Sequence, residues 1–472
     1  MRPVVQGAVA SLVLTFDIGT SSIKAGLFER DTARAVWQHR EPLPSEEHEL
    51  AAWETERWVR AVQAFVDQMP PSPEIAAVVL SGNGPTIVPV GRDGSSLDQA
   101  MLWMDRREER VLGQRSFFLP KISWIKHNAP AVYDQTWQFM TCPEYIGFLL
   151  TSVPHTTTAS EEFAPYIWDD DGLLAYGVEA EKLPPLLKPG EMIGSIDRRG
   201  AELFRLPLGI PVFAGGPDFL MSLLGTAVVK LGRTCDRAGM SEGINHCSSE
   251  PCDSSTVRCL PHVVPGLYNV AGILSSTGRI FEWFRRISRQ RSVGYERMLR
   301  EIAATGFDHE PYFFPSVHEG AAWEFSKGMF VGLRWDHATA EMGRGVVYSI
   351  GYAVRQSIES LKAVGCNVEE LRVCGGQAKS PIWNQMKADI TGIPVVRPEV
   401  IDAELLGSAC CAFVGLGDFS TPWEASVRVV RMTERFEPDP ARSRRFTDGY
   451  ERYLRAYQRY SKAIREAEEA DF

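Results

Sequence analysis

Short apolar runs that end in glycine-containing turns recur along the chain and predict buried strands. Residues 12–16 run into a turn that begins at Asp17, and the apolar pattern resumes at residues 23–28. Residues 75–80 end in Ser-Gly-Asn-Gly-Pro, and residues 371–374 end in Gly-Gly-Gln. Apolar runs bounded by turn residues in this way are typical of strands at the centre of a sheet.

Apolar residues at helical spacing fill much of the chain between these predicted strands. Residues 54–68 and residues 344–363 each place large apolar side chains on one face. Residues 447–469 are rich in charged and aromatic side chains and predict a surface helix. Strands that alternate with helices predict an α/β fold.

The pattern of strand and glycine turn occurs in both halves of the chain. Residues 210–214 form a predicted strand that ends in Gly-Gly-Pro-Asp, and a new set of strands and helices follows. We therefore expect an N-terminal domain over residues 11–215 and a C-terminal domain over residues 216–472. A cleft between two such domains is a common position for a small-molecule site.

Composition and charge narrow the class of protein. The 472 residues carry a formal net charge of -10 with acidic and basic residues interspersed, which gives no reason to expect nucleic-acid binding. No apolar stretch approaches the roughly 20 residues that span a bilayer, so we expect no membrane insertion. The first residues lack the apolar region of an export signal, and a cytoplasmic location is expected. The loose cluster of cysteines and histidines fits no zinc spacing, so free thiols are expected: His246, Cys247, Cys252, Cys259 and His262.

The turn at residues 17–24, Asp-Ile-Gly-Thr-Ser-Ser-Ile-Lys, joins two predicted strands. A Walker P-loop or a Rossmann fingerprint would lead into a helix instead. Gly19 nevertheless allows close backbone approach to a nucleotide triphosphate, Lys24 supplies a positive charge, and Asp17 suits a magnesium ion held through water. The candidate hydroxyl ligands of the phosphates are Thr20, Ser21 and Ser22. A plain hairpin turn explains these residues equally well.

Asp218 follows the Gly-Gly-Pro turn at the end of a predicted strand. A carboxylate in this position is well placed to take a proton from a substrate hydroxyl, and phosphoryl transfer requires a group that orients the nucleophile. The competing interpretation is that Asp218 is the N-cap of the helix that follows. Taken alone, the motif favours the cap.

Two further segments have compositions that suit ligand binding. In the segment 374–389, glycines would let adenine lie on the backbone and Asn384 would hydrogen-bond the base, although Ser380 and Pro381 also predict an ordinary helix start. In the segment 102–107, Trp103 and Asp105 would hold a sugar through ring packing and hydrogen bonds to hydroxyls. A surface helix start with a salt bridge is the alternative for this second segment.

These four pieces, in this order and with these separations, resemble the FGGY carbohydrate kinases, the family that includes xylulokinase, gluconokinase and glycerol kinase. The likeness extends over about residues 12–417 and includes landmarks at 121–124, 328–333 and 402–409. The resemblance implies an α/β protein with two ribonuclease-H-like domains of the actin-like ATPase type. It also implies that ATP and a sugar bind in the interdomain cleft.

The resemblance assigns a role to each candidate residue. Asp218 is the expected general base, and Asp17 and Asp218 are the expected carboxylates near Mg2+. A second phosphate turn is expected at Gly239 and Ser241. The residues expected to contact the sugar are Asn83, Trp103, Asp105 and Asp218. The residues expected to line the adenosine pocket are Gly375, Gly376, Gln377 and Asn384.

Three positions depart from the pattern of the family. Met240 stands where the second phosphate turn often has threonine, which removes a hydroxyl. Gln377 stands where a third glycine is frequent. Pro85 stands where xylulokinases commonly carry a histidine after the Ser-Gly-Gln run, and proline offers no such donor. The departure at Pro85 points away from ordinary xylulokinase activity.

We therefore expect ATP- and Mg2+-dependent transfer of the γ-phosphate to a hydroxyl of a ketose, a sugar acid or a polyol. The alternative is an actin-like ATPase or nucleotide-gated binding protein without a sugar acceptor, which would have no use for Trp103 and Asp105. A homodimer is the default expectation for assembly. The pattern specifies no particular sugar, because specificity depends on a few loop contacts.

Overall fold

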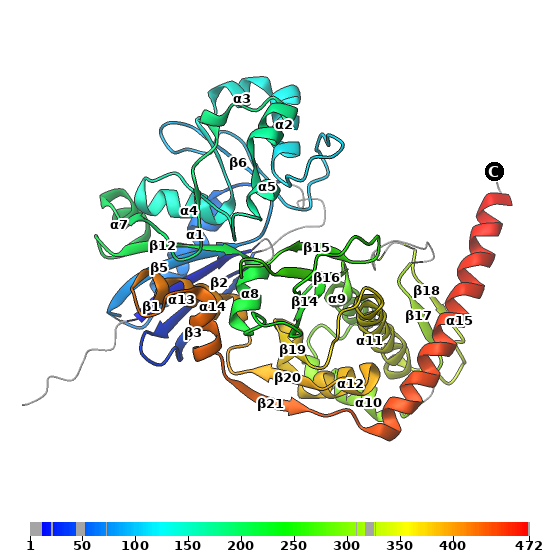
Figure 1. Cartoon of the computed structure of the whole chain (residues 1–472). Coiled ribbons are helices and arrows are strands. Elements are labelled where there is room, and N and C mark those ends of the chain that lie inside the picture. Colours follow the sequence, from blue (N-terminus) through cyan, green and yellow to red (C-terminus); the bar gives the residue numbers. More distant parts are fainter. Residues whose placement is uncertain are drawn as a thin grey trace, which may run out of the picture. The chain divides into compact units, whose positions relative to one another are not determined.

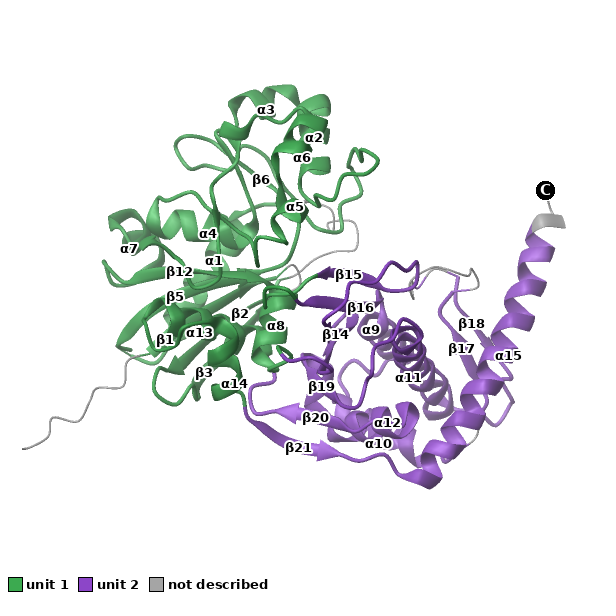
Figure 2. Cartoon of the chain, in the orientation of Figure 1, with its two compact units in different colours: residues 1–229, 261–266, 403–430 green, residues 230–260, 267–402, 431–472 purple. Residues whose placement is uncertain are grey.

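The chain forms two compact units in a computed structural model that describes residues 12–19, 22–43, 52–71, 73–307, 309–316, 325 and 327–470. Unit 1 comprises residues 1–229, 261–266 and 403–430, and unit 2 comprises residues 230–260, 267–402 and 431–472 (Figure 2). The packing thus interleaves the two halves of the sequence. The predicted boundary between an N-terminal domain at residues 11–215 and a C-terminal domain at residues 216–472 stays a prediction.

Unit 1 is built on a six-stranded sheet with the order β11-β12-β5-β1-β2-β3 (Figure 1). β1 is antiparallel to β2 and parallel to β5, which is in turn parallel to β12. The strands are β1 (Leu12–Ile18), β2 (Ser22–Glu29), β3 (Ala35–Pro42), β5 (Ile75–Gly82), β11 (Met192–Ser195) and β12 (Pro211–Pro217). β1 and β5 are almost wholly buried, as their continuous apolar pattern predicts.

Helices pack on this sheet through apolar faces. In α1, Trp58, Val62 and Phe65 join the buried core, at the spacing predicted for a helix there. α8 and α13 approach each other so closely that Gly225 and Gly407 leave no room for a Cβ. The helices are α1 (Glu56–Gln68), α4 (Cys142–Thr151), α7 (Arg198–Phe204), α8 (Asp218–Gly225), α13 (Ala403–Gly415) and α14 (Pro422–Val429).

A region of short elements adds to unit 1 between β5 and β11. It contains β6, which pairs with β8, and two further two-residue pairings. Its elements, with β4, are β4 (Ala52–Trp53), β6 (Val88–Val90), β7 (Ala100–Met101), α2 (Leu119–Asn128), α3 (Pro130–Gln135), β8 (Gln138–Met140), β9 (Thr156–Thr157), α5 (Ala164–Ile167), α6 (Asp170–Tyr176), η2 (Ala180–Lys182) and β10 (Leu186–Leu187).

Unit 2 is built on a seven-stranded sheet with the order β15-β16-β14-β13-β19-β20-β21. The strands are β13 (Thr234–Ala238), β14 (Glu242–Ser248), β15 (Arg258–Pro261), β16 (Tyr268–Leu274), β19 (Leu371–Cys374), β20 (Val395–Pro398) and β21 (Met432–Phe436). The other elements are α9 (Thr277–Ile287), α10 (Tyr295–Ala304), β17 (Tyr312–Phe314), β18 (Met329–Val331), α11 (Thr339–Ala363), η3 (Gly376–Lys379), α12 (Pro381–Thr391) and α15 (Pro440–Ala470).

The predicted strands and helices are found at or near their expected positions. The helix predicted over 344–363 begins earlier, at Thr339. The interpretation of Asp218 as an N-cap is wrong, because Asp218 is the first residue of α8 and Pro217 precedes it without a side-chain cap. None of the described helices combines the length and apolarity needed to cross a bilayer.

Candidate functional site

The carboxyl ends of three parallel strands bring predicted site residues to one edge of the unit 1 sheet. Ile18 at the end of β1, Gly82 at the end of β5 and Pro217 at the end of β12 are in register. Asn83 and Asp218 follow directly, and Asp17 lies one residue before the end of β1. Because neighbouring strands lie about 4.8 Å apart, the strands that carry Asp17 and Asp218 are about 10 Å apart.

Asp17 is buried and accepts a hydrogen bond from the Ser81 hydroxyl at 3.3 Å. In the antiparallel pairing of β1 and β2 it lies opposite Lys24. The Lys24 ammonium forms a salt bridge with the Glu404 carboxylate on α13. Ser22 is buried at the start of β2.

The predicted hydroxyl ligands Thr20 and Ser21 lie outside the described residues. The predicted phosphate turn of unit 1 is therefore described on its two flanks, at residues 17–19 and 22–24. Those flanks place a carboxylate and an ammonium on opposite sides of the turn.

Cys142, at the start of α4, is a residue of this edge that the sequence patterns did not reveal. Its thiol donates a hydrogen bond to the Ile18 carbonyl at 3.5 Å. Burial raises the pKa of Cys142 well above its ordinary value, and the carboxylates of Glu144, Asp17 and Asp218 raise that pKa further. The thiol is therefore neutral and lies near both candidate magnesium carboxylates.

A local sequence motif, not among the patterns considered above, marks the helix start at which Cys142 lies. Thr141 and Glu144 form a capping box around the start of α4, which is the recognisable pattern of threonine followed three residues later by glutamate. That pattern predicts where α4 begins in the sequence. It does not indicate which edge of the sheet the helix contacts.

Both side-chain amide atoms of Asn83 form hydrogen bonds with neighbouring residues of unit 1. Its amide nitrogen donates to the Ile18 carbonyl at 3.3 Å, and its amide oxygen accepts from the Thr86 hydroxyl. Asn83 thus joins the end of β5 to the end of β1. The hydrogen bond to Ile18 thus helps to hold the two strand ends together at the sheet edge where Asp218 lies.

Asp218 is half-buried at the first position of α8. The backbone before it passes so close to the Leu80 carbonyl that Gly215 has no room for a Cβ. A carboxylate in the first turn of a helix interacts favourably with the helix dipole. The glycines and the helix start therefore hold the Asp218 carboxylate at the sheet edge.

Asp105 is engaged by its own neighbour. Its carboxylate accepts hydrogen bonds from the Arg107 backbone at 2.8 Å and from the Arg107 guanidinium at 2.6 and 3.1 Å. The Arg107 guanidinium lies over the Trp124 ring, 4.9 Å from its centre. Trp103 is 44% exposed. The expected salt bridge is present, but the alternative of a helix start is wrong, because no helix begins between residues 102 and 107.

In unit 2, a tight turn joins β13 to β14 at the predicted second phosphate position. The Gly239 N–H donates to the Ser241 carbonyl at 2.8 Å, and the Arg279 N–H donates to the Met240 carbonyl at 3.2 Å. An added Cβ at Gly278 would overlap the Gly239 carbonyl. The first residues of α9 thus pack directly against this turn, and the Met240 side chain is 43% exposed.

The predicted adenosine turn, which begins at Gly375, packs against the predicted phosphate turn of unit 2. Gly375 adopts a positive φ of 84°, and a Cβ there would lie 2.5 Å from the Ala238 carbonyl. The Gln377 amide nitrogen donates to the Gly239 carbonyl at 3.0 Å and to the Thr277 hydroxyl at 3.2 Å, while its oxygen accepts from the Trp383 indole at 3.0 Å. Gln377 therefore connects the two turns of unit 2.

Asn384 lies beneath the adenosine turn. It is fully buried, and its amide donates to the Ala378 carbonyl at 2.9 Å. Ser380 caps α12 by accepting from the Trp383 N–H, and Pro381 follows at the first helical position, as predicted. Gly376, by contrast, has open space where a side chain would be.

Asp17 and Asp218 are the two carboxylates predicted to lie near a magnesium ion. Within the described residues, no group of three or more His, Cys, Asp or Glu side chains is arranged to hold a metal ion. Mg2+ characteristically keeps several waters and binds one or two carboxylates together with substrate phosphates. Asp17 and Asp218 supply hard oxygen donors at one sheet edge and fit that mode.

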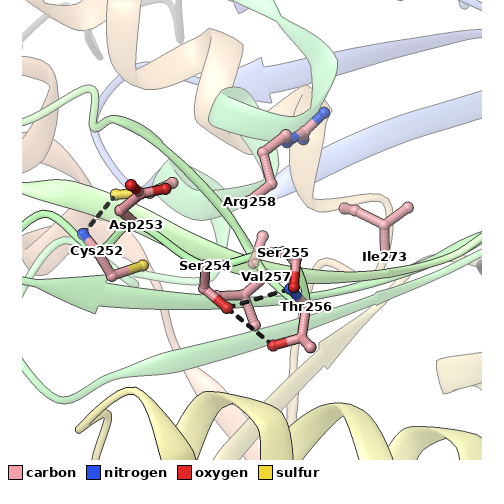
Figure 3. Close-up of a pocket in the computed structure, with 10 residues that line it drawn as sticks. Cys252, Asp253, Ser254, Ser255, Thr256, Val257, Arg258 and Ile273 are labelled. Atoms are coloured by element: carbon pink, nitrogen blue, oxygen red, sulfur yellow. Dashed lines mark hydrogen bonds between the residues drawn. The ribbon is translucent and has the colours of Figure 1, made fainter. Parts of the chain in front are cut away.

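A cavity of about 450 Å3 lies elsewhere in unit 2, beside β15 and β16 (Figure 3). It is lined by residues 252–259 with Ala271 and Ile273, and none of the predicted site residues belongs to it. Cys252 and Cys259 are free thiols. Burial raises the pKa of Cys252 to about 11, so this thiol is largely neutral near neutral pH.

Comparison with known proteins gives consistent matches. Models of the FGGY family of carbohydrate kinases match residues 108–225 (N-terminal domain) and 237–416 (C-terminal domain). The xylulose kinase of Staphylococcus epidermidis is 25% identical over 494 residues, covering 95% of this chain and 96% of that protein. The autoinducer-2 kinase of Salmonella paratyphi B is 24% identical over 502 residues, covering 94% of each.

A solved structure extends the likeness to the fold. The gluconate kinase of Lactobacillus acidophilus superposes with a TM-score of 0.79 at 19% identity, covering 96% of this chain and 98% of that one. The predicted fold class, two ribonuclease-H-like α/β domains of the actin-like type, is thereby confirmed.

Proposed function

The chain belongs to the FGGY family of carbohydrate kinases, and we propose that Asp218 is its general base and ATP its phosphate donor. As a member of this family it is a phosphotransferase that acts on a hydroxyl group of a sugar or sugar-derived substrate. The family predicted from the sequence is confirmed, and the alternative of an ATPase without a sugar acceptor is not favoured.

The observation that carries the proposal is the register of β1, β5 and β12. Ile18, Gly82 and Pro217 end the three strands at one level, so Asp17 and Asp218 project from the same edge of one sheet. Ligands of open α/β sheets bind outside the carboxyl ends of the strands. This edge is the position at which a phosphate donor and an acceptor hydroxyl would meet a base.

In the proposed reaction the Asp218 carboxylate accepts the proton of the attacking sugar hydroxyl as the O–P bond forms. The bond between the γ-phosphorus and the bridging oxygen breaks, and ADP leaves with the electron pair. Catalysis of this kind depends mainly on positioning and on stabilisation of charge. Bound Mg2+ would neutralise charge on the phosphates, with Asp17 and Asp218 as the residues that hold it.

We propose nucleotide contacts for each unit by itself. Lys24 of unit 1 would contact the terminal phosphate. In unit 2, the turn at Gly239 and Ser241 would contact the phosphates, and Gly375 and Gly376 would support the adenosine. The hydrogen bond from the Gln377 amide to the Gly239 carbonyl, which joins the segment after Gly376 to the turn at Gly239, supports this assignment.

For the acceptor we propose a ketose, a sugar acid or a polyol. The relatives include kinases named for xylulose, a ketose, and for gluconate, a sugar acid. Pro85 stands where xylulokinases commonly carry a histidine, which favours a substrate other than xylulose. Trp103 is the most exposed of the proposed sugar contacts.

An ADP-release screen tests the proposal. The purified chain is incubated with Mg-ATP and with individual ketoses, aldonates and polyols, and ADP is measured against a no-sugar blank. ADP release that depends on one of these acceptors supports the function. Basal ATP hydrolysis that no acceptor stimulates would contradict it.

A further inference from the structure

Three charged side chains lie wholly inside unit 2, away from every surface. Lys387 on α12 forms salt bridges with Asp236 on β13 and with Glu242 on β14, the second at 2.7 Å. The three side chains are at most 1% exposed. Buried charges are costly unless they are paired, so this cluster requires an explanation.

The surroundings of the cluster favour a proton on one of its carboxyl groups. Burial, and then the neighbouring Glu242 carboxylate, raise the pKa of Asp236 well above its ordinary value. Burial lowers the pKa of Lys387, but Asp236 and Glu242 outweigh that effect and raise it overall. Both shifts favour the protonated forms of Asp236 and Lys387.

That proton also has a defined place. Asp236 Oδ1 and Glu242 Oε2 are buried and have no hydrogen-bond partner among the described residues. A proton shared between the two carboxyl groups would satisfy both oxygens. Buried polar groups are almost always paired, so the two orphaned oxygens support the same protonation state as the raised pKa of Asp236.

The position of the cluster relates it to the nucleotide turns. Asp236 is the central residue of β13 and Glu242 is the first residue of β14, so the two lie on either side of the proposed phosphate turn. Lys387 lies on α12, the helix that begins directly after the adenosine turn. The cluster thus connects, from inside the unit, the same two turns that Gln377 connects at the surface.

We infer that Lys387, with Asp236 and Glu242, is a positioning residue. It fixes the phosphate turn relative to α12 and so positions the unit 2 groups proposed to contact the nucleotide. The inference rests on the proposed nucleotide role of these turns. Stability alone does not explain the cluster, because apolar replacement of a buried ion pair is often neutral or stabilising. A geometric constraint does explain it, because three charges from three elements satisfy one another in a single arrangement.

The test compares nucleotide binding with sugar kinetics in variants of the whole chain. Lys387→Met is expected to weaken ADP binding roughly tenfold, because small displacements of positioning groups are costly, and to leave the KM for the sugar within about twofold. Lys387→Met/Glu242→Gln removes the unbalanced charge and provides a second variant if the first folds poorly. Lys362→Met, at an exposed lysine of α11, is the matched control.

ADP binding is measured by calorimetric titration, and the melting temperature is recorded for each variant. A lower melting temperature with ADP affinity within twofold of wild type in both Lys387 variants would overturn the inference, since the cluster would then be structural only. Loss of ADP affinity with the sugar KM retained supports it. If the wild-type chain binds ADP but phosphorylates no acceptor, the proposed function fails while this binding test still stands.

Discussion

Lys24 on β2 and Glu404 on α13 form a salt bridge although 380 residues separate them in the sequence. Both side chains are largely buried. The pair lies beside Asp17, the cross-strand neighbour of Lys24. The lysine proposed to contact the terminal phosphate thus forms a salt bridge with Glu404, on a helix from the later part of the sequence.

Glu404→Gln is expected to tighten ATP binding, because it removes the negative charge that Glu404 places beside Lys24, near the proposed phosphate position. The gain should be roughly tenfold, or about 1.4 kcal/mol, with a lower melting temperature because the salt bridge between Lys24 and Glu404 is lost. Lys24→Met should weaken ATP binding. Equilibrium titration with a non-hydrolysable ATP analogue measures both effects. Weaker binding in Glu404→Gln would show instead that Glu404 orients Lys24 for the phosphate.

Asp218→Asn should abolish most of the turnover and leave nucleotide binding intact. The amide keeps the size of the side chain but cannot accept the proton of the sugar hydroxyl, and loss of a general base typically costs about 10²–10⁴-fold in rate. Acceptor-dependent ADP release measures kcat, and titration measures nucleotide affinity. Asp170→Asn, at an exposed aspartate in the first turn of α6, is the control. Unchanged kcat in Asp218→Asn would remove this residue as the base.

Gln377→Ala should raise the KM for ATP more than it lowers kcat. The substitution removes hydrogen bonds to the Gly239 carbonyl, the Thr277 hydroxyl and the Trp383 indole. The bond to the Gly239 carbonyl is the one that joins the two turns, and a single such bond is worth about 1 kcal/mol net, so the KM for ATP should rise roughly fivefold while the sugar KM stays the same. Steady-state kinetics with either substrate varied measures the split.

The control for this variant is Gln356→Ala, at an exposed glutamine of α11. Gln377→Gly restores the residue frequent in the family at this position. A Gln377→Gly variant with unchanged kinetics would show that the turns hold their positions without the bridge. Equal increases in both KM values would instead indicate a general loss of structure in unit 2.

Local sequence patterns were enough to predict the strands and the turns that follow them. The runs before Asp17, Asn83 and Gly375 are mainly apolar and lie next to glycine turns, although β1 extends through Ile18 and β5 through Gly82. The register that brings Asp17 and Asp218 to one edge follows from the parallel pairing of β1, β5 and β12. The strands and turns were therefore predictable from local periodicity, whereas the ribonuclease-H-like fold was inferred from the resemblance to the FGGY family and the shared sheet edge is seen in the structure.

The partners of the site residues were not predictable in the same way. Glu404 reaches Lys24, and Gln377 reaches Gly239, through tertiary packing of elements far apart in the sequence. Asp105 was predicted to bind sugar hydroxyls, but its carboxylate accepts from Arg107 two residues later. No periodicity distinguishes a carboxylate aimed at a ligand from one aimed at a neighbouring guanidinium, since both need the same residue types.

The buried carboxyl group of Glu144 should make the stability of unit 1 depend on pH. Its two oxygens accept from the Thr141 and Thr157 N–H groups at 3.1 and 2.7 Å, but burial outweighs these bonds and raises the pKa of Glu144 to about 7 from an ordinary value of 4.5. A raised folded-state pKa contributes stability that is fully present below the unfolded pKa. That contribution is lost as the pH rises from about 4.5 to about 7.

Comparison with Glu144→Gln isolates this effect. The amide does not titrate, so the difference in free energy of unfolding between wild type and variant should change by about 3 kcal/mol across that range, against the wild type at higher pH. Burial also lowers the pKa of His155 and of His262 to about 4, which opposes the trend, but these histidines are present in both proteins and their effect cancels in the difference. Urea unfolding between pH 5 and pH 8 provides the measurement, with Glu162→Gln at an exposed position as control. Parallel stability curves for wild type and Glu144→Gln would mean that the Thr141 and Thr157 N–H groups keep Glu144 ionised, because two hydrogen bonds to the charged form would then offset the cost of burying it.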